Sequence, residues 1–164
     1  MLSLQVSKYS THPTGKELSY NNNMSTRSTI SLKTKDGYRS IYCHFDGYPD
    51  HNGNLLLDHY DTQEKVEELI ALGSLSSLNK HPKPAEGDKH SHCHPAKGVT
   101  VAYARDRGER LVVHEYKTLD ELADEFEDYN YIFNDGRWEL LSLSHENNID
   151  SASLDIICKG TPIQ

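Results

Sequence analysis

Short apolar runs separated by turn residues are the feature of this sequence that most constrains its fold. Two pairs of such runs flank a turn signal: residues 29–32 and 40–45 around Asp36-Gly37, and residues 129–133 and 138–143 around Asn134-Asp135-Gly136. An Asp-Gly step between two short segments of this kind is a strong signal for a β-hairpin. We therefore expect a sheet that is built mostly from hairpins.

Helices are expected at three places between these hairpins. Apolar residues spaced i, i+3 and i+4 predict a helix over about 63–72, and a shorter helix is expected around Leu55. Thr118 and Glu121 fit a capping box, in which each residue satisfies a backbone N–H of the other. Because apolar residues at helical spacing follow this box, we predict a helix across 118–128.

The remaining segments are assigned from composition and turn signals. Residues 98–103 and 111–116 are predicted to form a further hairpin around residues 106–108, and residues 154–158 to form an edge strand. Residues 74–97 are rich in Ser, Pro, Lys, His and Gly, so a mobile loop is expected there. Together these elements predict an α+β fold: a mostly antiparallel sheet built from hairpins, with two or three helices on one face.

The composition excludes several classes of protein. No run approaches the roughly 18 apolar residues of a membrane span, and no basic start with an apolar core marks a secretory signal. The three cysteines form no Cys-x-x-Cys pair, so no disulfide framework is expected. These features favour a cytoplasmic protein without membrane association.

Residues 1–24 are interpreted as a flexible N-terminal extension, because Ser, Thr, Asn and Lys dominate and no apolar periodicity is present. The sequence leaves open whether translation starts at Met1 or at Met24. Residues 25–164 are expected to form a single domain.

Acidic residues are concentrated in two blocks. The chain has 25 Asp and Glu against 17 Lys and Arg, and a formal net charge of −8. Residues 41–75 contain seven acidic and one basic residue, and residues 118–128 contain six acidic residues and no basic one. Since phosphate backbones are bound by clustered Lys and Arg, direct binding of nucleic acid is not expected. Either the blocks form an acidic face for a basic partner protein, or they are a solvated surface that keeps the protein soluble.

Charged side chains at two places are candidates for binding a partner. In the predicted helix over 118–128, the candidates that should face water are Asp120, Asp124, Glu127 and Asp128. Arg105 and Arg107 lie at a charged turn, and a guanidinium can grip a phosphate or carboxylate with two parallel hydrogen bonds. The alternative for this turn is a solvated tip with internal ion pairs.

The densest group of chemically active side chains comprises Cys43, His44, Asp46, Tyr48, Asp50, His51 and Asn52. Two imidazoles and two carboxylates so close together suit a metal site or acid–base catalysis. If the protein were an enzyme, its catalytic candidates would be His44, Asp46, Asp50 and His51. The alternative is that Asp46 and Asn52 serve a turn and a helix cap. We favour a role without catalysis, in which Asp46, Tyr48 and Asp50 belong to a binding surface.

A second cluster, which contains His90, His92, Cys93 and His94, has side chains that bind zinc, nickel or copper. Structural zinc sites take their ligands from two separated pairs, and only this one cluster is present in the sequence. Adventitious metal is therefore expected rather than a native site, and no cofactor is expected.

The pattern STRS-x-I, then Y-x-H-[FW]-D-G-Y-P and a following G, covers residues 24–73 of this chain. It resembles a group of small uncharacterised proteins of bacteriophages, prophages and mobile elements. The resemblance implies a phage-type accessory protein, and such proteins commonly bind host machinery or host defence components. It supplies no activity and no catalytic residue.

The sequence therefore favours a small acidic protein that acts by binding and inhibits a host protein, such as a CRISPR or restriction component. The expected partner has a basic surface that normally holds nucleic acid. Two alternatives stay open. One is a metal-dependent hydrolase or nuclease that uses the cluster from His44 to His51. The other is a protein that sequesters a nucleotide signal through Arg27, Arg105 and Arg107.

Overall fold

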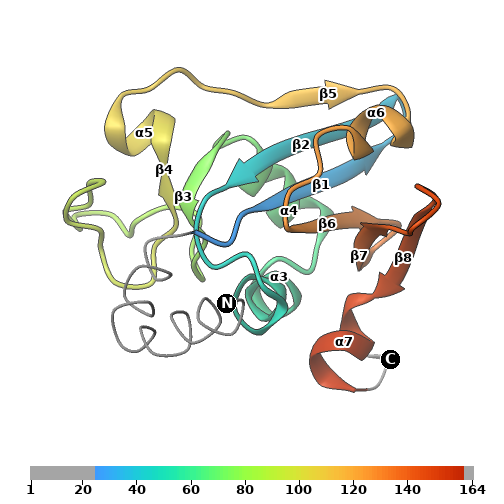
Figure 1. Cartoon of the computed structure of the whole chain (residues 1–164). Helices are drawn as coiled ribbons and strands as arrows, with labels where there is room; N and C mark the ends of the chain where they lie inside the picture. Colours follow the sequence, from blue (N-terminus) through green and yellow to red (C-terminus); the bar gives the residue numbers. More distant parts are fainter. Residues whose placement is uncertain (1–24, 161–164) are drawn as a thin grey trace, which may run out of the picture.

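One mixed sheet organises the part of the molecule that the structure describes. The computed structural model describes residues 25–160, so the predicted extension, residues 1–24, lies outside the described residues, as do the last four. The strand order is β4-β3-β2-β1-β6-β7-β8, and β5 pairs with β2 off this path (Figure 1). The strands are β1 (Ser28–Thr34), β2 (Gly37–Cys43), β3 (Leu75–Ser77), β4 (Val101–Ala102), β5 (His114–Tyr116), β6 (Tyr129–Asn134), β7 (Arg137–Leu143) and β8 (Ile149–Ser153).

Both hairpins predicted from Asp-Gly turns are present. β1 pairs with β2 in antiparallel register, and β6 pairs with β7 around Asp135 and Gly136, whose φ values are 53° and 79°. Positive φ at both turn residues matches the twist of the flanking strands. The two hairpins join through β1 and β6, which are parallel. The mixed α+β fold with a mostly antiparallel sheet is thus confirmed.

The larger core lies on one face of the sheet, under three helices: α3 (Asn54–His59), α4 (Gln63–Ile70) and α7 (Leu154–Lys159). The predicted helix over 63–72 is therefore confirmed, and the Thr62 side chain caps it by accepting the Lys65 N–H. Trp138 and Tyr60 tie the sheet to the helices, because the indole N–H donates to the Tyr60 carbonyl at 2.7 Å.

The opposite face of the sheet carries a smaller core under α6 (Leu119–Ala123). The Thr118–Glu121 capping box is present as predicted, but the helix is five residues long and does not cross 118–128. Its end has a local cause. The buried amide of Asn130 accepts the Glu127 N–H at 2.8 Å and donates to the Glu127 carbonyl at 3.0 Å. Because the N–H and C=O of Glu127 bond the Asn130 side chain, Glu127 does not continue the backbone hydrogen bonds of the helix.

The third predicted hairpin is wrong. β4 leads into the short helix α5 (Tyr103–Arg107), and β5 then pairs with β2 instead of with β4. The Asp106 carboxylate accepts the Ala102 N–H at 2.8 Å, which closes a single helical turn. Gly108 ends this turn in the left-handed region at φ 75°. The turn residues in the sequence favoured a hairpin, but the buried Asp106 side chain stabilises a helical turn instead.

The predicted edge strand over 154–158 is also wrong, because these residues form α7 and β8 is the last strand of the path. Leu154 is fully buried and Cys158 packs against the same core, and the i, i+4 spacing of these two residues requires a helix. Their β-type neighbours Ile156 and Ile157 are exposed, so β propensity has no packing partner there.

None of the helices in residues 25–160 has the length and apolar character needed to traverse a lipid bilayer.

Candidate functional site

The segment from His44 to His51, called the aromatic loop below, leaves the sheet at the end of β2. Its first two residues continue the pairing of β2, since the N–H groups of His44 and Phe45 donate to the carbonyls of Leu75 and Ser76, each at 3.0 Å. Phe45 and Tyr48 are nevertheless 42% and 37% exposed. The loop therefore presents two large aromatic side chains to solvent from a backbone fixed by hydrogen bonds.

Buried polar contacts hold the aromatic loop from below. The η1 turn (Pro49–Gly53) contains Asn52, which is fully buried and donates to Ser28 Oγ at 3.3 Å and to Cys43 Sγ at 3.5 Å. The Tyr131 hydroxyl donates to the Gly47 carbonyl. A Cβ at Gly47 would lie 2.8 Å from the Cβ of Ser28, so only glycine fits there. The glycine of the Asp-Gly-Tyr-Pro pattern is therefore explained by its close packing against Ser28.

Cys43 is not a nucleophile in this setting. Its side chain is fully buried, and burial raises the pKa of the thiol to about 11 although Asn52 and other donors oppose the shift. The uncharged thiol contributes to packing, as buried cysteines usually do.

Three of the four catalytic candidates of the aromatic loop, Asp46, Asp50 and His51, lie around the Tyr48 side chain, and His44 is held by Tyr42. The His44 Nδ1 atom bonds the Tyr42 hydroxyl at 2.7 Å, the His51 Nδ1 atom bonds Asn52 Oδ1 at 2.9 Å, and Asp46 accepts the Tyr48 hydroxyl at 3.1 Å. Burial, and next the charge of Arg27, lower the pKa of His44. No group of three His, Cys, Asp or Glu side chains among residues 25–160 could hold a metal ion. These side chains therefore form hydrogen bonds within the loop and do not assemble a metal site among the described residues.

The acidic residues 120–128, called the acidic segment below, approach the aromatic loop at their C-terminal end, Asp128. Thr26 and Arg27 connect the two, since the Gly47 N–H donates to the Thr26 carbonyl at 2.9 Å. The Arg27 N–H donates to Asp128 Oδ2 at 3.0 Å, and the Tyr129 N–H donates to the Arg27 carbonyl at 3.2 Å. The end of the acidic segment at Asp128 is therefore tied to the aromatic loop, whereas α6 packs near Tyr38 at the other end of β2.

The predicted binding residues of the acidic segment differ in their exposure. Asp120 and Asp124 are exposed, Glu127 is half-buried, and Asp128 is exposed although its carboxylate accepts the Arg27 N–H. Glu127 lies close enough to affect Tyr42: burial raises the pKa of this tyrosine, Arg27 opposes the shift, and Glu127 adds to it. Glu127 is thus the acidic side chain that faces the sheet.

A pocket of about 260 Å³ opens between the acidic segment and the sheet. Its walls are formed by Tyr42 from β2, His114 and Tyr116 from β5, and Glu125 and Glu127 from the acidic segment. Of these five residues, the sequence predicted only Glu127 as a binding residue. The alternation of β2 could have placed Tyr42 on this face, but the pairing of β5 with β2 has no local signal.

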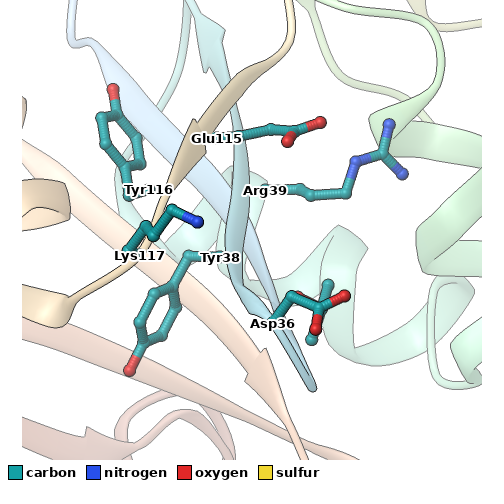
Figure 2. Close-up of a pocket in the computed structure, with 7 residues that line it drawn as sticks. Asp36, Tyr38, Arg39, Glu115, Tyr116 and Lys117 are labelled. Atoms are coloured by element: carbon teal, nitrogen blue, oxygen red, sulfur yellow. The ribbon is translucent and has the colours of Figure 1, made fainter.

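A second pocket of about 310 Å³ lies at the far end of β2 and β5. The register partners Arg39 and Glu115 extend side by side there, and Asp36 and Lys117 complete the charged lining (Figure 2). Two positive and two negative side chains give this pocket no preference for a ligand of either charge. It is a weaker candidate than the pocket beside the acidic segment.

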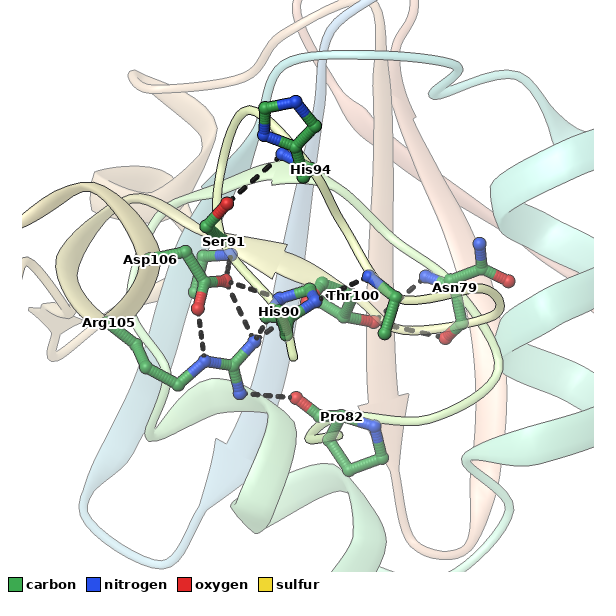
Figure 3. A network of polar contacts seen from close by, with 10 residues as sticks. Asn79, Pro82, His90, Ser91, His94, Thr100, Arg105 and Asp106 are labelled. Carbon is green, nitrogen blue, oxygen red and sulfur yellow. Dashed lines mark hydrogen bonds and ion pairs between the residues drawn. The ribbon is translucent and has the colours of Figure 1, made fainter. Parts of the chain in front are cut away.

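A network of hydrogen bonds and ion pairs fixes Arg105 and residues 90–94, called the histidine-rich segment below (Figure 3). His90 Nδ1 accepts the Ala96 N–H at 2.9 Å, so the Nε2–H of the same ring donates to Asp106 Oδ2 at 3.0 Å. The Arg105 guanidinium donates to Asp106 and to the carbonyls of Pro82 and Thr100. This use of its donors leaves Arg105 poorly placed to bind a ligand.

The neighbouring candidates have other contacts. Arg107 lies over the ring of Tyr103 at 5.8 Å and pairs with Glu109 at 3.0 Å. The His92 ring also stacks on Tyr103, with the two ring centroids 6.0 Å apart. The range predicted as a loop contains β3 and these fixed contacts, and its mobility stays a prediction.

Asp50 is exposed, and its backbone carbonyl accepts the Asn54 amide at 3.0 Å. Cys93 and His94 are exposed as well. Comparison of the chain with protein-family models, with curated proteins and with solved structures gave no match.

Proposed function

We propose that the protein acts by binding a host protein through the surface formed by the aromatic loop and the acidic segment. The observation that carries this proposal is the link through Thr26 and Arg27, which joins the backbone of the aromatic loop to Asp128, the last carboxylate of the acidic segment. Protein interfaces are typically anchored by aromatic residues with a charged rim around them.

The rigidity of the aromatic loop supports a binding role. Phe45 and Tyr48 stand on a backbone held by the Leu75 and Ser76 carbonyls and by Thr26, so little conformational freedom is lost when a partner covers them. Preorganised anchors of this kind gain affinity by reducing the entropy lost on association. The exposed carboxylates of the acidic segment would raise the association rate toward a positively charged surface.

The partner we propose is a host protein whose basic surface normally holds nucleic acid. The acidic segment would compete with phosphate groups for the same Lys and Arg side chains. Together with the resemblance to phage-type accessory proteins, this favours inhibition of a host defence component, of the CRISPR or restriction kind, in the host cytoplasm. Catalysis is not part of the proposal.

The test is affinity capture from host lysate followed by direct measurement with the purified partner. Replacement of the two exposed aromatics (Phe45→Ala with Tyr48→Ala) should weaken the complex by roughly 30-fold or more, since hot-spot residues exceed about 2 kcal/mol. The double variant Asp124→Asn with Glu127→Gln should also weaken the complex. This loss of affinity should be larger at low salt concentration, because salt screens the attraction that the variant removes.

A matched control removes two charges from the other face of the sheet, Glu64→Gln with Glu67→Gln on α4, and should leave the affinity within about twofold. The purified wild-type protein should also displace nucleic acid from the partner. Unchanged affinity in both surface variants would refute the proposed surface, and a partner that still binds nucleic acid fully in the complex would refute the proposed inhibition.

A further inference from the structure

We infer that the pocket between β5 and the acidic segment receives an arginine side chain of the partner protein. This inference rests on the proposed function, because it names the group that the partner would insert. The pocket has a volume of about 260 Å³ and combines two tyrosines with two glutamates. Such a lining suits a cation with a flat, polarisable face.

The two carboxylates of the pocket form no ion pair in the described part of the chain, and the Arg27 side chain bonds the hydroxyl of Tyr42. The ion pairs of residues 25–160 involve other acidic side chains, namely Asp58, Asp61, Glu68, Asp106 and Glu109. Glu125 is exposed and Glu127 is half-buried, so one carboxylate stands at the mouth and the other closer to the sheet. A guest that supplies positive charge to both would find a complementary site.

The aromatic walls are placed on the sheet rather than on mobile side chains. Tyr42 and Tyr116 are half-buried on β2 and β5, and the His114 ring stacks on Tyr116 with centroids 6.1 Å apart and planes 19° from parallel. Glu125 lies near Tyr116, and Glu127 lies near Tyr42, as their effects on the tyrosine pKa values show. Each ring therefore has one carboxylate near it, and Tyr42 also has the Arg27 side chain at its hydroxyl.

This arrangement favours arginine over lysine. A guanidinium carries N–H donors in one plane, so it can bridge two carboxylates while its face lies on an aromatic ring. An ammonium group is a compact charge that keeps its water more strongly and gains less from a flat wall. Thr29 also lines the pocket, and its hydroxyl donates to Asn130 Oδ1 at 2.9 Å.

The experiment titrates the full chain with N-acetyl-arginine amide, and separately with N-acetyl-lysine amide, while backbone amide signals are followed by NMR. We expect saturable shifts centred on Tyr42, His114 and Tyr116 with the arginine probe, with a Kd in the range of about 1–20 mM for one side chain. The lysine probe should bind at least about threefold more weakly.

Variants assign the effect to the pocket. Glu125→Gln with Glu127→Gln keeps the shape of both side chains and should weaken arginine binding by roughly tenfold. The matched control Asp120→Asn with Asp124→Asn removes two charges of the same segment outside the pocket and should change it by less than about twofold. Absence of saturation, equal binding of lysine, or equal effects of the two double variants would overturn the inference.

The outcome separates this inference from the proposed function. If the partner is captured normally by the Glu125→Gln, Glu127→Gln variant but the arginine probe does not bind the wild type, the pocket inference fails and the wider surface stands. If the probe binds the pocket but the Phe45 and Tyr48 variant captures the partner as well as the wild type, the proposed surface fails instead.

Discussion

At the scale of single residues, Asp106 has the largest influence on the segment between β3 and β4. Its side chain is only 3% exposed, and it accepts hydrogen bonds from the Ala102 N–H, from Arg105 and from His90. Burial alone would raise the pKa of this carboxyl, but these donors outweigh burial and lower the pKa to about 2 from its ordinary 3.8. One carboxylate thus anchors both α5 and the histidine-rich segment.

The first prediction concerns pH. Since the fold lowers the pKa of Asp106, the carboxylate contributes stability in full above about pH 5 and loses it as the pH falls toward 2. The shift corresponds to about 2 kcal/mol in the free energy of unfolding. In urea denaturation at pH 6, Asp106→Asn should be less stable than the wild type by about 3 kcal/mol, because His90 and Arg105 lose their partner.

The difference in the free energy of unfolding between wild type and Asp106→Asn should be smaller at pH 2.5. At that pH the Asp106 carboxylate is partly protonated and has lost part of its stabilising effect. Asp88→Asn changes an exposed carboxylate of the same segment. Its free energy of unfolding should differ from that of the wild type by close to zero at both pH values. A gap for Asp106→Asn that does not change with pH would contradict the assignment.

At the scale of elements, the end of α6 and the path of the acidic segment depend on Asn130. Its buried side chain accepts from Thr29 and from the Glu127 N–H, and it donates to the Glu127 carbonyl. An alanine here leaves those groups without partners in a buried place.

The second prediction is that Asn130→Ala lowers the free energy of unfolding by about 2–4 kcal/mol. The Glu127 amide should also exchange its hydrogen much faster, because its acceptor is gone. Asn148→Ala, at an exposed turn, serves as the control and should shift the free energy of unfolding by less than about 1 kcal/mol. If the Glu127 amide keeps its protection in Asn130→Ala, another group holds the acidic segment.

How well the elements could be predicted depends on how local their causes are. The hairpins β1–β2 and β6–β7 were predictable, because Asp-Gly turns and flanking alternation lie within a few residues. The pairing of β5 with β2 and the parallel pairing of β1 with β6 join distant segments and leave no periodicity in the sequence. α7 was missed because burial at i and i+4 outweighed the β propensity of its isoleucines.

At the scale of the whole molecule, we predict that folding does not depend on a metal. In the histidine-rich cluster, both nitrogens of His90 are used by Ala96 and Asp106. His92 stacks on Tyr103, and no group of three donors is assembled in residues 25–160.

The third prediction is that a chelator leaves the melting temperature within about 2 °C, because a structural metal would contribute far more than that to folding. The measurement is a thermal melt with and without EDTA, combined with metal analysis of the purified protein. Stoichiometric zinc and loss of the melting transition on chelation would contradict the prediction.

The candidate site was predictable only in parts. The aromatic loop was predicted from its dense group of side chains, and the acidic segment from its charge. Their contact through Thr26 and Arg27, and the pocket that needs β2, β5 and the acidic segment together, depend on the assembled sheet.

The parallel pairing of β1 with β6 also has a consequence for synthesis of the chain. β1 and β2 are complete once residue 43 has been made, yet the other edge of β1 has no partner until residues 129–134 follow. At the usual pace of translation this interval lasts on the order of 5–20 s. During it, a strand that is buried in the folded protein offers free N–H and C=O groups to any extended neighbour. The nascent chain is therefore most prone to mispairing and aggregation before its second hairpin leaves the ribosome.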